Sequence, residues 1–385
     1  MSDRLFTPRF FIMCGFTFTV FLSVFQLLPT APFHIHDLGG STFASGLFLG
    51  FLTYSSAFSA PLTGAFADRV GPRRVLLTSS VAITIFSLVY ALLQDYRWML
   101  AIVIVHGIFW SGLLSASAAY MTNLLPERRR AEGIGYWGLS TVAALAVAPT
   151  VGFWIYRRGW VWLCVVSASL NIMMAIIAWF LKEQPVAPAH ERTGGLLEWR
   201  VLALSVTLFL YSFGYGGITS FTALYAEANQ VAPKAIYLTT LAIVILLTRP
   251  MAGRLGDRWG YKRVFAPCLG LITAGLTCLA FGGSRGLLIA SAILFGIGFG
   301  TAYPVYVGYV MRDVSATRRG AAFGAILAAF DTGVGTGSTS MGWLIQHYGF
   351  RTAFGVAAAL SAIALPYFLT MDRMLNKVPD SPIAD

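Results

Sequence analysis

The sequence predicts an all-α membrane protein whose twelve transmembrane helices form two pseudo-symmetric six-helix bundles, with both termini in the cytoplasm. Three observations predict this architecture. The chain has 385 residues, of which 57% are hydrophobic and only 11% are charged. It contains twelve long apolar runs, and one charged turn between two of them returns later in the chain. Because a soluble globular domain carries about 25% charged residues, the composition excludes a single soluble enzyme.

The apolar runs divide into two sets of six. A helix needs about 20 apolar residues to cross a bilayer, and the first set comprises 10–29, 43–67, 75–94, 98–121, 133–156 and 160–181. The second set comprises 201–226, 235–253, 264–282, 287–311, 320–345 and 352–371. We therefore expect an N-terminal six-helix bundle over 1–181, a cytoplasmic linker over 182–199, and a C-terminal six-helix bundle with a short cytoplasmic tail over 200–385.

The distribution of Lys and Arg predicts the orientation. Twenty of the 27 lie in the terminal segments and in every second loop, starting with the loop between spans two and three, and six lie in the opposite loops. Under the positive-inside rule, the richer set faces the cytoplasm. The remaining one, Arg249, lies inside span eight, close enough to that face for its side chain to reach it. The net charge of +11 is thus a topology signal, and we expect no nucleic-acid partner.

The absence of several motifs excludes other functions. The sequence has no Walker loop, HExxH, nucleophile elbow or Cys/His cluster, so we expect no cofactor, no metal and no enzymatic activity. All four cysteines lie in apolar runs, where a thiol behaves as a small hydrophobe. Short loops without an N-x-[ST] sequon favour a bacterial inner membrane, where we expect a monomer surrounded by the lipid bilayer.

A charged turn occurs twice with the same spacing. At an offset of 189 residues, six positions correspond in order: Gly64, Asp68, Arg69, Gly71, Arg73 and Arg74 with Gly253, Asp257, Arg258, Gly260, Lys262 and Arg263. An offset of 190 pairs Gly152 with Gly342 and Gly159 with Gly349. One spacing across separated regions indicates a duplication. Since both turns face the cytoplasm, the repeat is parallel, and a path is expected between the halves.

These residues carry a resemblance to the major facilitator superfamily of transporters, whose loop between spans two and three has the signature G-x-x-x-D-R-x-G-[RK]-[RK]. The resemblance covers essentially the whole chain. It implies that Asp68 latches a cytoplasmic gate by facing the N-terminus of span eleven near Gly320, and that Asp257 faces span five in the same way. Such a contact is worth about 0.3–2 kcal/mol. The alternative is structural: the glycines permit a tight turn, and the arginines anchor it at the cytoplasmic face.

Three titratable residues are candidates for proton coupling, because charge inside a bilayer is costly and therefore suggests function. Asp331 lies near the middle of span eleven, among small residues. It could hydrogen-bond Ser or Thr at a close helix crossing, hold a proton or cation, or contact substrate. His106 in span four is either a packing residue or a proton carrier. Glu227, at the outer end of span seven, is the third candidate.

The resemblance also implies that spans one, four, seven and ten line the central path. Candidates for the substrate cavity on these spans are Gln26, Trp110, Tyr211, Tyr215, Tyr303 and Tyr306. The alternative for the aromatic residues is packing. A cavity with few charges and many aromatic rings would suit an amphipathic or weakly charged organic substrate.

Span five resembles, in part, the drug/metabolite:proton antiporters of the superfamily. Their G-x-x-x-G-P-x-x-G-G pattern corresponds here to Ala144, Ala148, Pro149 and Gly152, which still permit a bent, closely packed helix. Span four lacks the usual Arg, since Val103 occupies its place. The leading hypothesis is therefore proton-coupled export of a small organic molecule. The alternatives are an importer or uniporter of a metabolite in the same fold, and a non-transporting sensor or scaffold.

Overall fold

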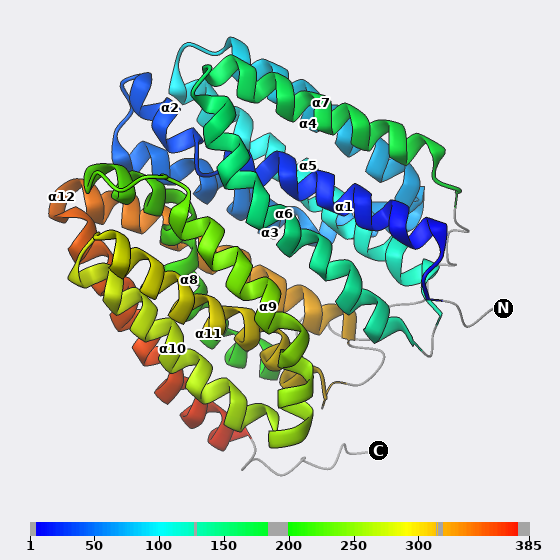
Figure 1. The fold of residues 1–385 in the computed structure, drawn as a ribbon. Coiled ribbons are helices and arrows are strands. Elements are labelled where there is room, and N and C mark those ends of the chain that lie inside the picture. Colours follow the sequence, from blue (N-terminus) through cyan, green and yellow to red (C-terminus); the bar gives the residue numbers. More distant parts are fainter. Residues whose placement is uncertain (1–4, 127–128, 184–198, 313, 315–318, 376–385) are drawn as a thin grey trace.

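The structure is a computed structural model, which describes residues 5–126, 129–183, 199–312, 314 and 319–375. The side chains of residues 130, 131, 199, 253, 254, 257, 319–321 and 323 lie outside that description. The described part is built from helices, and their order along the chain follows the expected runs (Figure 1).

The first half contains seven of these helices. They are α1 (Pro8–Leu27), α2 (Ala31–Asp37), α3 (Thr42–Val70), α4 (Pro72–Leu92), α5 (Tyr96–Leu124), α6 (Arg130–Tyr156) and α7 (Trp160–Phe180). The second half contains α8 (Trp199–Ala228), α9 (Ile236–Trp259), α10 (Tyr261–Phe281), α11 (Arg285–Arg312) and α12 (Arg319–Leu375). Most helices extend two to four residues beyond the apolar runs, because helical hydrogen bonding continues past the hydrocarbon region.

The short helix α2 was not expected from the sequence, which predicted a loop after residue 29. Pro29 has no N–H to donate and so interrupts the helix after α1. Pro32 then stands in the first turn of α2, where a missing N–H costs little. As a result, α1 and α2 together form an apolar stretch from Pro8 to Asp37.

Besides Gly39 between α2 and α3, four glycines with positive φ mark described reversals of the chain, and they fall into the two pairs that the repeat predicts. Gly71 and Gly260 have φ of +98° and +86°, and Gly159 and Gly349 have φ of +114° and +80°. Residues with a side chain rarely adopt such angles, whereas glycine does so at little cost. Gly349 is the non-helical residue inside α12. We use the Gly71 end and the Gly349 end as names for the two ends of the molecule.

Each half forms its own bundle, and the two bundles lie side by side (Figure 1). Within the halves, α4 packs on α7, α1 on α6, α8 on α12 and α10 on α11. Between the halves, α3 packs on α12 and α6 on α9. In terms of the spans expected from the sequence, span two packs on span eleven, and span five packs on span eight.

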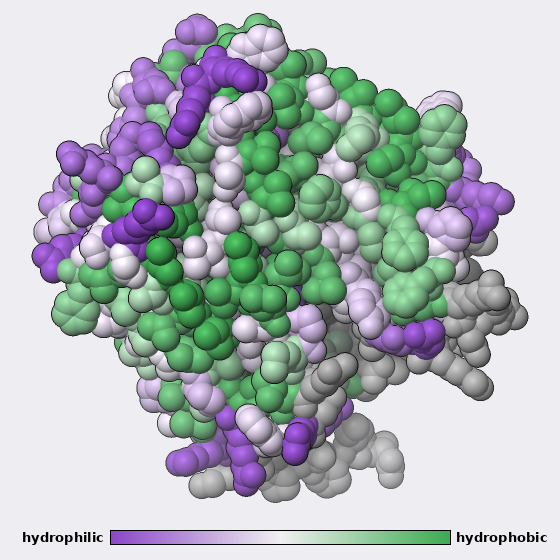
Figure 2. Space-filling model, in the orientation of Figure 1, coloured by the Kyte–Doolittle hydropathy of each residue, from purple (hydrophilic) through white to green (hydrophobic). Residues whose placement is uncertain are grey.

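The surface is that of a membrane protein. Among the described residues, ten helical stretches are long and apolar enough to cross a membrane, and Ile236–Ala252 is a shorter apolar stretch. Large apolar side chains lie exposed on the outside of the bundles, including Phe58, Leu92 and Phe180. Figure 2 shows apolar side chains over the middle of one face and hydrophilic ones toward its ends. This distribution fits a chain whose middle contacts lipid.

Candidate functional site

A seam of small residues joins α3 to α12 on the Gly349 side of the molecule. The seam consists of Gly46 and Gly50 on α3 and of Gly335, Ser338 and Gly342 on α12. The Ser338 hydroxyl donates to the carbonyl oxygen of Gly46 at 2.8 Å. A Cβ atom added to Gly342 would lie 2.9 Å from the carbonyl oxygen of Thr42. Small residues therefore bring the backbones of the two halves together.

Hydrogen bonds join the two halves at this α3–α12 seam and also at the separate contact of α6 with α9. Among the described residues there are five: Phe43 N to Gln346 Oε1 (3.1 Å), Ser338 Oγ to Gly46 O (2.8 Å), Tyr54 to Thr336 (2.8 Å), Ser56 to Asp331 (3.3 Å) and Thr150 to Thr239 (2.8 Å). Inside a membrane such a bond is worth about 0.6–2 kcal/mol. The sum is a few kcal/mol, similar to the gap between two conformations of a switching protein.

Of these contacts, the one made by Asp331 lies farthest along its helices from the Gly349 end. The Ser56 hydroxyl on α3 donates to Asp331 Oδ2 on α12 at 3.3 Å. Next to it, Gly333 and Gly337 approach the backbone of α8, and Gly335 approaches α3. The carboxylate thus accepts a hydrogen bond from Ser at a close helix crossing, which is the first of the three interpretations that the sequence allowed. This bond leaves the other carboxylate oxygen available.

Two of the tyrosines expected at the cavity lie near Asp331. Tyr303 on α11 interacts electrostatically with Asp331 and also with Arg249 on α9. Tyr215 on α8 interacts with the same guanidinium and stacks on the Phe299 ring at 4.5 Å between centroids. Tyr215 and Tyr303 are both partly exposed inside the molecule. Both rings also lie near that of Phe330, the residue before Asp331, with 6.2 Å between centroids for Tyr215 and 5.6 Å for Tyr303.

Arg249 lies three residues before the end of the apolar stretch Ile236–Ala252, and the expectation that its side chain reaches the cytoplasmic face stays a prediction. Arg249 is ten residues before the end of α9 at Trp259, about 15 Å along a helix axis. The Arg249 side chain is half-buried, and Tyr215 and Tyr303 are its electrostatic neighbours. The sequence identified Arg249 but did not predict these neighbours, because the packing of α8 and α11 on α9 determines its surroundings.

The other two tyrosines lie in the core of the second half. Tyr211 is fully buried, with its ring edge-on to Phe265 and Phe299 at 6.4 and 6.0 Å. The hydroxyl of Tyr306 pairs with that of Ser205 at 3.1 Å. The structure therefore separates these two residues from Tyr215 and Tyr303 and places them in a packed interior.

Gln26 and Trp110, also expected at the cavity, lie in the interior of the first half. The Gln26 side-chain amide donates to the Ser167 hydroxyl on α7 at 2.8 Å, and its carbonyl oxygen has no partner. Trp110 packs edge-on against Phe21 of α1 with 5.3 Å between ring centroids. Neither side chain is placed with Asp331.

His106 lies between α5 and α4 and is 2% exposed. Its Nδ1 pairs with the Tyr90 hydroxyl at 3.2 Å, and its ring lies 5.7 Å from that of Phe86. Its Nε2 has no hydrogen-bond partner among the described residues. This environment matches the packing alternative that the sequence left open.

Glu227 lies at the Gly349 end of α8. It forms an ion pair with Lys234, whose ammonium group lies 4.5 Å from the ring centre of Phe33 in the other half. The two charged residues line a polar hollow of about 630 Å³ together with Asp37 and Tyr156. Glu227 thus stands apart from Asp331, near the outer contacts between the halves.

The small residues expected to bend span five lie within α6. Ala144, Ala148 and Pro149 are buried, and the helix continues through Pro149. A Cβ atom added to Gly152 would lie 2.8 Å from the carbonyl oxygen of Gln26. These residues let α6 pack closely on α1.

The repeated turns hold their own halves together. In the first half, Arg73 donates to the carbonyl oxygen of Trp179 at 2.6 Å, and Arg74 pairs with Glu183 at 2.9 Å. In the second half, Lys262 pairs with Asp372, which also accepts a hydrogen bond from Tyr309. The two acidic partners are themselves 189 residues apart in the chain. Glu183 and Asp372 were not predicted from the repeat, which was identified only at the turns and at the glycines.

The remaining gate candidates lie at the surface of the Gly71 end. Asp68, Arg69, Arg258, Gly260 and Arg263 are exposed, and nothing lies within 4 Å of a Cβ atom added to Gly64. Gly253, Asp257 and the first residues of α12 around Gly320 lie outside the described side chains. The contact of Asp68 with α12 therefore stays a prediction.

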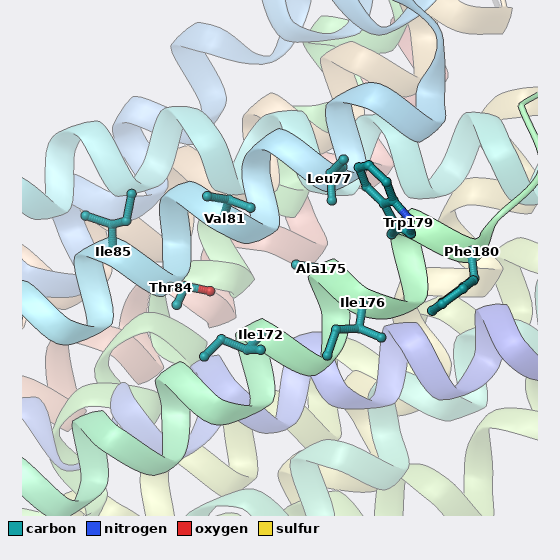
Figure 3. Close-up of a pocket in the computed structure, with 9 residues that line it drawn as sticks. All are labelled: Leu77, Val81, Thr84, Ile85, Ile172, Ala175, Ile176, Trp179 and Phe180. Atoms are coloured by element: carbon teal, nitrogen blue, oxygen red, sulfur yellow. The ribbon is translucent and has the colours of Figure 1, made fainter.

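An apolar groove of about 400 Å³ lies between α4 and α7 (Figure 3). Its only side-chain oxygen belongs to Thr84, which donates to the carbonyl oxygen of Ser80 at 2.8 Å. A solute site needs polar groups that fix orientation, so this groove resembles a lipid-facing surface. Within the described ranges, no three His, Cys, Asp or Glu side chains gather as metal ligands would.

Comparison with known proteins identifies relatives of this arrangement. The family model described as Major Facilitator Superfamily matches residues 12–235 and 204–384. An uncharacterized MFS-type transporter of Pseudomonas aeruginosa is 27% identical over 91% of this chain and 90% of its own length. Another, of Burkholderia pseudomallei, is 26% identical over 90% and 88%.

Solved structures share the fold. A mutant of the nucleoside transporter NupG has a TM-score of 0.79 at 16% identity and covers 94% of this chain and 99% of its own. The human organic anion transporter MFSD10 has a TM-score of 0.71 at 17% identity, covering 94% and 100%. A bacterial homologue of the human lysosomal transporter Spinster has a TM-score of 0.79 at 15% identity, covering 97% and 98%. At these identities the likeness concerns the fold alone.

Proposed function

The chain belongs to the Major Facilitator Superfamily, and from this premise we propose that it is a secondary active transporter that exports a small organic molecule in exchange for protons. One observation carries the proposal: the Ser56–Asp331 pair joins the two halves beside Tyr215 and Tyr303. A carboxylate that faces both halves can couple its protonation to their relative movement, because losing its charge changes the cost of exposing it.

We propose that the chain crosses the bacterial inner membrane twelve times as a monomer, with both termini in the cytoplasm. Counting α1 with α2 as one span and dividing α12 at Gly349 gives twelve. The excess of Lys and Arg at the Gly71 end supports the orientation. The division into bundles at 1–181 and 200–385, with a linker over 182–199, follows from the same count.

We further propose that the described conformation is closed at the outer, Gly349 end. The hydrogen bonds between described residues of the two halves lie toward that end, and the Lys234 ammonium over the Phe33 ring adds to them. Alternating access requires these contacts to open while the Gly71 end closes. Asp68 and its counterpart Asp257 are the proposed latches of the opposite state.

A flux assay tests the function. The full chain is reconstituted in proteoliposomes with a pH gradient, and counterflow of a panel of organic solutes is measured together with the pH of the lumen. Solute movement opposite to proton movement supports exchange. Movement of both in one direction would make the protein an importer, and flux that ignores the gradient would make it a uniporter. Absence of any flux would favour a sensor.

A further inference from the structure

We propose that the groove between α4 and α7 binds one anionic phospholipid, with an acyl chain in the groove and the phosphate at Arg73 and Arg74. The groove and the two arginines meet at the Gly71 end, so that one elongated site has an apolar body and a cationic head. The inference does not depend on transport. With the proposed orientation, the lipid belongs to the cytoplasmic leaflet.

The groove is apolar and follows the two helices. It has a volume of about 400 Å³ and is lined from Leu77 to Ile85 on α4 and from Ile172 to Phe180 on α7. In Figure 3, Leu77 and Trp179 are toward one end of the groove, and Ile85 and Ile172 toward the other. Leu77 and Ile85 are about 12 Å apart along a helix axis, and the hydrocarbon of one leaflet is about 15 Å thick. The groove therefore has the length and the chemistry to hold an acyl chain.

Arg73 lies at the end of the groove that Trp179 lines. It precedes Leu77 by four residues on α4, so the two side chains share a helix face. The Arg73 Nη2 donates to the carbonyl oxygen of Trp179 at 2.6 Å, and the guanidinium carbon lies 5.9 Å from the centre of the Trp179 ring. A positive charge is therefore fixed directly to a residue of the groove wall.

The Arg73 guanidinium is only partly satisfied. Its Nε has no hydrogen-bond partner among the described residues, and Arg73 makes no ion pair with any of them. Arg74, the next residue, is exposed and pairs with Glu183. Gly71, which caps α4, has no side chain to accept from the first-turn N–H groups, and such a helix start favours a phosphate. The lacking counterion and these donors call for an anion.

The second half shows how the corresponding cation is satisfied within the chain. Lys262, 189 residues after Arg73, pairs with Asp372, whose side chain is 8% exposed. The counterpart of Asp372 is Glu183, which pairs with Arg74 instead. The repeat thus provides one carboxylate for each basic turn, and the first half leaves Arg73 without it. We therefore expect the lipid site in the first half alone.

An anionic phospholipid combines the features that the site requires. Basic groups near the membrane surface attract anionic headgroups, whereas a zwitterionic lipid brings its own cation toward the arginines. Trp179 is 61% exposed at the end of α7, and tryptophan rings prefer the headgroup level of a bilayer. Lys182, exposed just beyond α7, adds positive charge there.

Native mass spectrometry of the purified full-length protein in a mild detergent tests the headgroup site. The probe is dioleoylphosphatidylglycerol, compared with dioleoylphosphatidylcholine, which has the same chains and no net charge. We expect the anionic lipid to bind at least about fivefold more tightly, and its Kd to increase about fivefold or more in Arg73→Gln. In Arg73→Lys, which keeps the charge, the increase should be smaller. Arg373→Gln is the matched control, because Arg373 is exposed near the end of α12 and should leave the Kd unchanged.

Glu183→Gln tests the same site in the opposite direction. This change releases Arg74 from its ion pair and leaves the bond between Arg73 and Trp179 in place, so the Kd for the anionic lipid should decrease about twofold or more. The experiment remains decisive even if Arg73→Gln does not fold.

The groove is tested by filling it. Ala175 lines the groove, so Ala175→Phe should exclude the acyl chain and increase the Kd for the anionic lipid by about fivefold or more. Met173→Phe is the control on the same helix, because Met173 is 43% exposed and outside the lining.

Four results would each overturn the proposal. They are equal affinity for the two lipids, wild-type affinity in a folded Arg73→Gln variant, wild-type affinity in Ala175→Phe, and no gain of affinity in Glu183→Gln. Glycerol phosphate, which has the charged group without chains, identifies the other source of a phosphate. If it displaces the anionic lipid at similar concentration, the arginines bind a free anion and the proposal fails.

Discussion

The Ser56 hydroxyl on α3 donates to the Asp331 carboxylate on α12 at 3.3 Å. This contact joins two halves that arose from one repeated sequence, and it lies where the seam of small residues ends. The Tyr303 ring lies near it, with 5.6 Å between its centroid and that of Phe330, the residue before Asp331. The contact therefore stands between the part of the molecule that holds the halves together and the part expected to hold the substrate.

Replacement of Asp331 by Asn tests its proposed role as the proton carrier. The amide oxygen can still accept from Ser56, but the side chain no longer titrates. We expect proton-driven flux to fall by about 100-fold, as for loss of a proton-transfer group, while Tm is retained or raised because a charge has left the interior. Ser56→Ala is the control: it removes one bond worth about 0.6–2 kcal/mol and keeps the charge. Equal flux in Asp331→Asn and wild type would contradict the role.

A bulky residue in the seam should prevent closure of the Gly349 end. In Gly342→Val, the added Cβ atom would lie 2.9 Å from the carbonyl oxygen of Thr42, so α3 and α12 must separate. The reporter is the disulfide yield between cysteines placed at Phe43 and Gln346, in a background without the four native cysteines. We expect a loss of about tenfold in yield if the closed state is disfavoured by about 1.4 kcal/mol.

Gly324→Val is the control for this experiment, because nothing lies within 4 Å of a Cβ atom added at Gly324 on the same helix. An undiminished yield in Gly342→Val would show that the seam does not govern closure.

The same disulfide reporter tests the latch proposed for Asp68. If Asp68 stabilises the conformation that is closed at the Gly71 end, then Asp68→Asn should move the population toward closure at the Gly349 end. The contact is worth about 0.3–2 kcal/mol, so we expect a modest increase in the Phe43–Gln346 yield together with slower flux. Asp95→Asn serves as control, since Asp95 caps α5 at the opposite end and Asn caps equally well. An unchanged yield in Asp68→Asn would rule out the latch.

The ion pairs made by the two corresponding acidic residues, Glu183 and Asp372, should differ in strength. The Asp372 side chain is 8% exposed and accepts from both Lys262 and Tyr309, whereas Glu183 is 49% exposed and pairs with Arg74. Asp372→Ala removes from a buried position the acceptor shared by Lys262 and Tyr309, and should lower stability by about 1–3 kcal/mol. Glu183→Ala removes a solvent-screened pair and should cost less than about 1 kcal/mol. Thermal unfolding of both variants in detergent checks the order, and similar losses would contradict it.

Some features were predictable because the chain itself specifies them locally. The apolar runs correspond to the helices, since backbone groups in lipid must bond within their own helix. The turns at Gly71 and Gly260 were predictable because only glycine adopts a positive φ cheaply, and the repeat transferred the conclusion from one copy to the other. The same argument applies to Gly159 and Gly349.

The candidate site was predictable only in part. Asp331, Tyr215 and Tyr303 were identified because polar groups stand out within apolar runs. Tyr211, Tyr306, Gln26 and Trp110 stand out equally and yet pack inside the bundles. The period of a helix shows which residues share a face, and it does not show which helix that face meets.

The sequence by itself determined the apolar helices, the duplication and the membrane class, because hydropathy, glycine conformation and charge act over a few residues at a time. Tertiary structure alone decided which polar side chains meet. Tyr215 and Tyr303 meet at Phe330 because α8, α11 and α12 pack together, and Asp331 meets Ser56 because small residues let α3 and α12 approach. These contacts join residues up to 275 positions apart in the chain, and only the packing of whole helices brings them together.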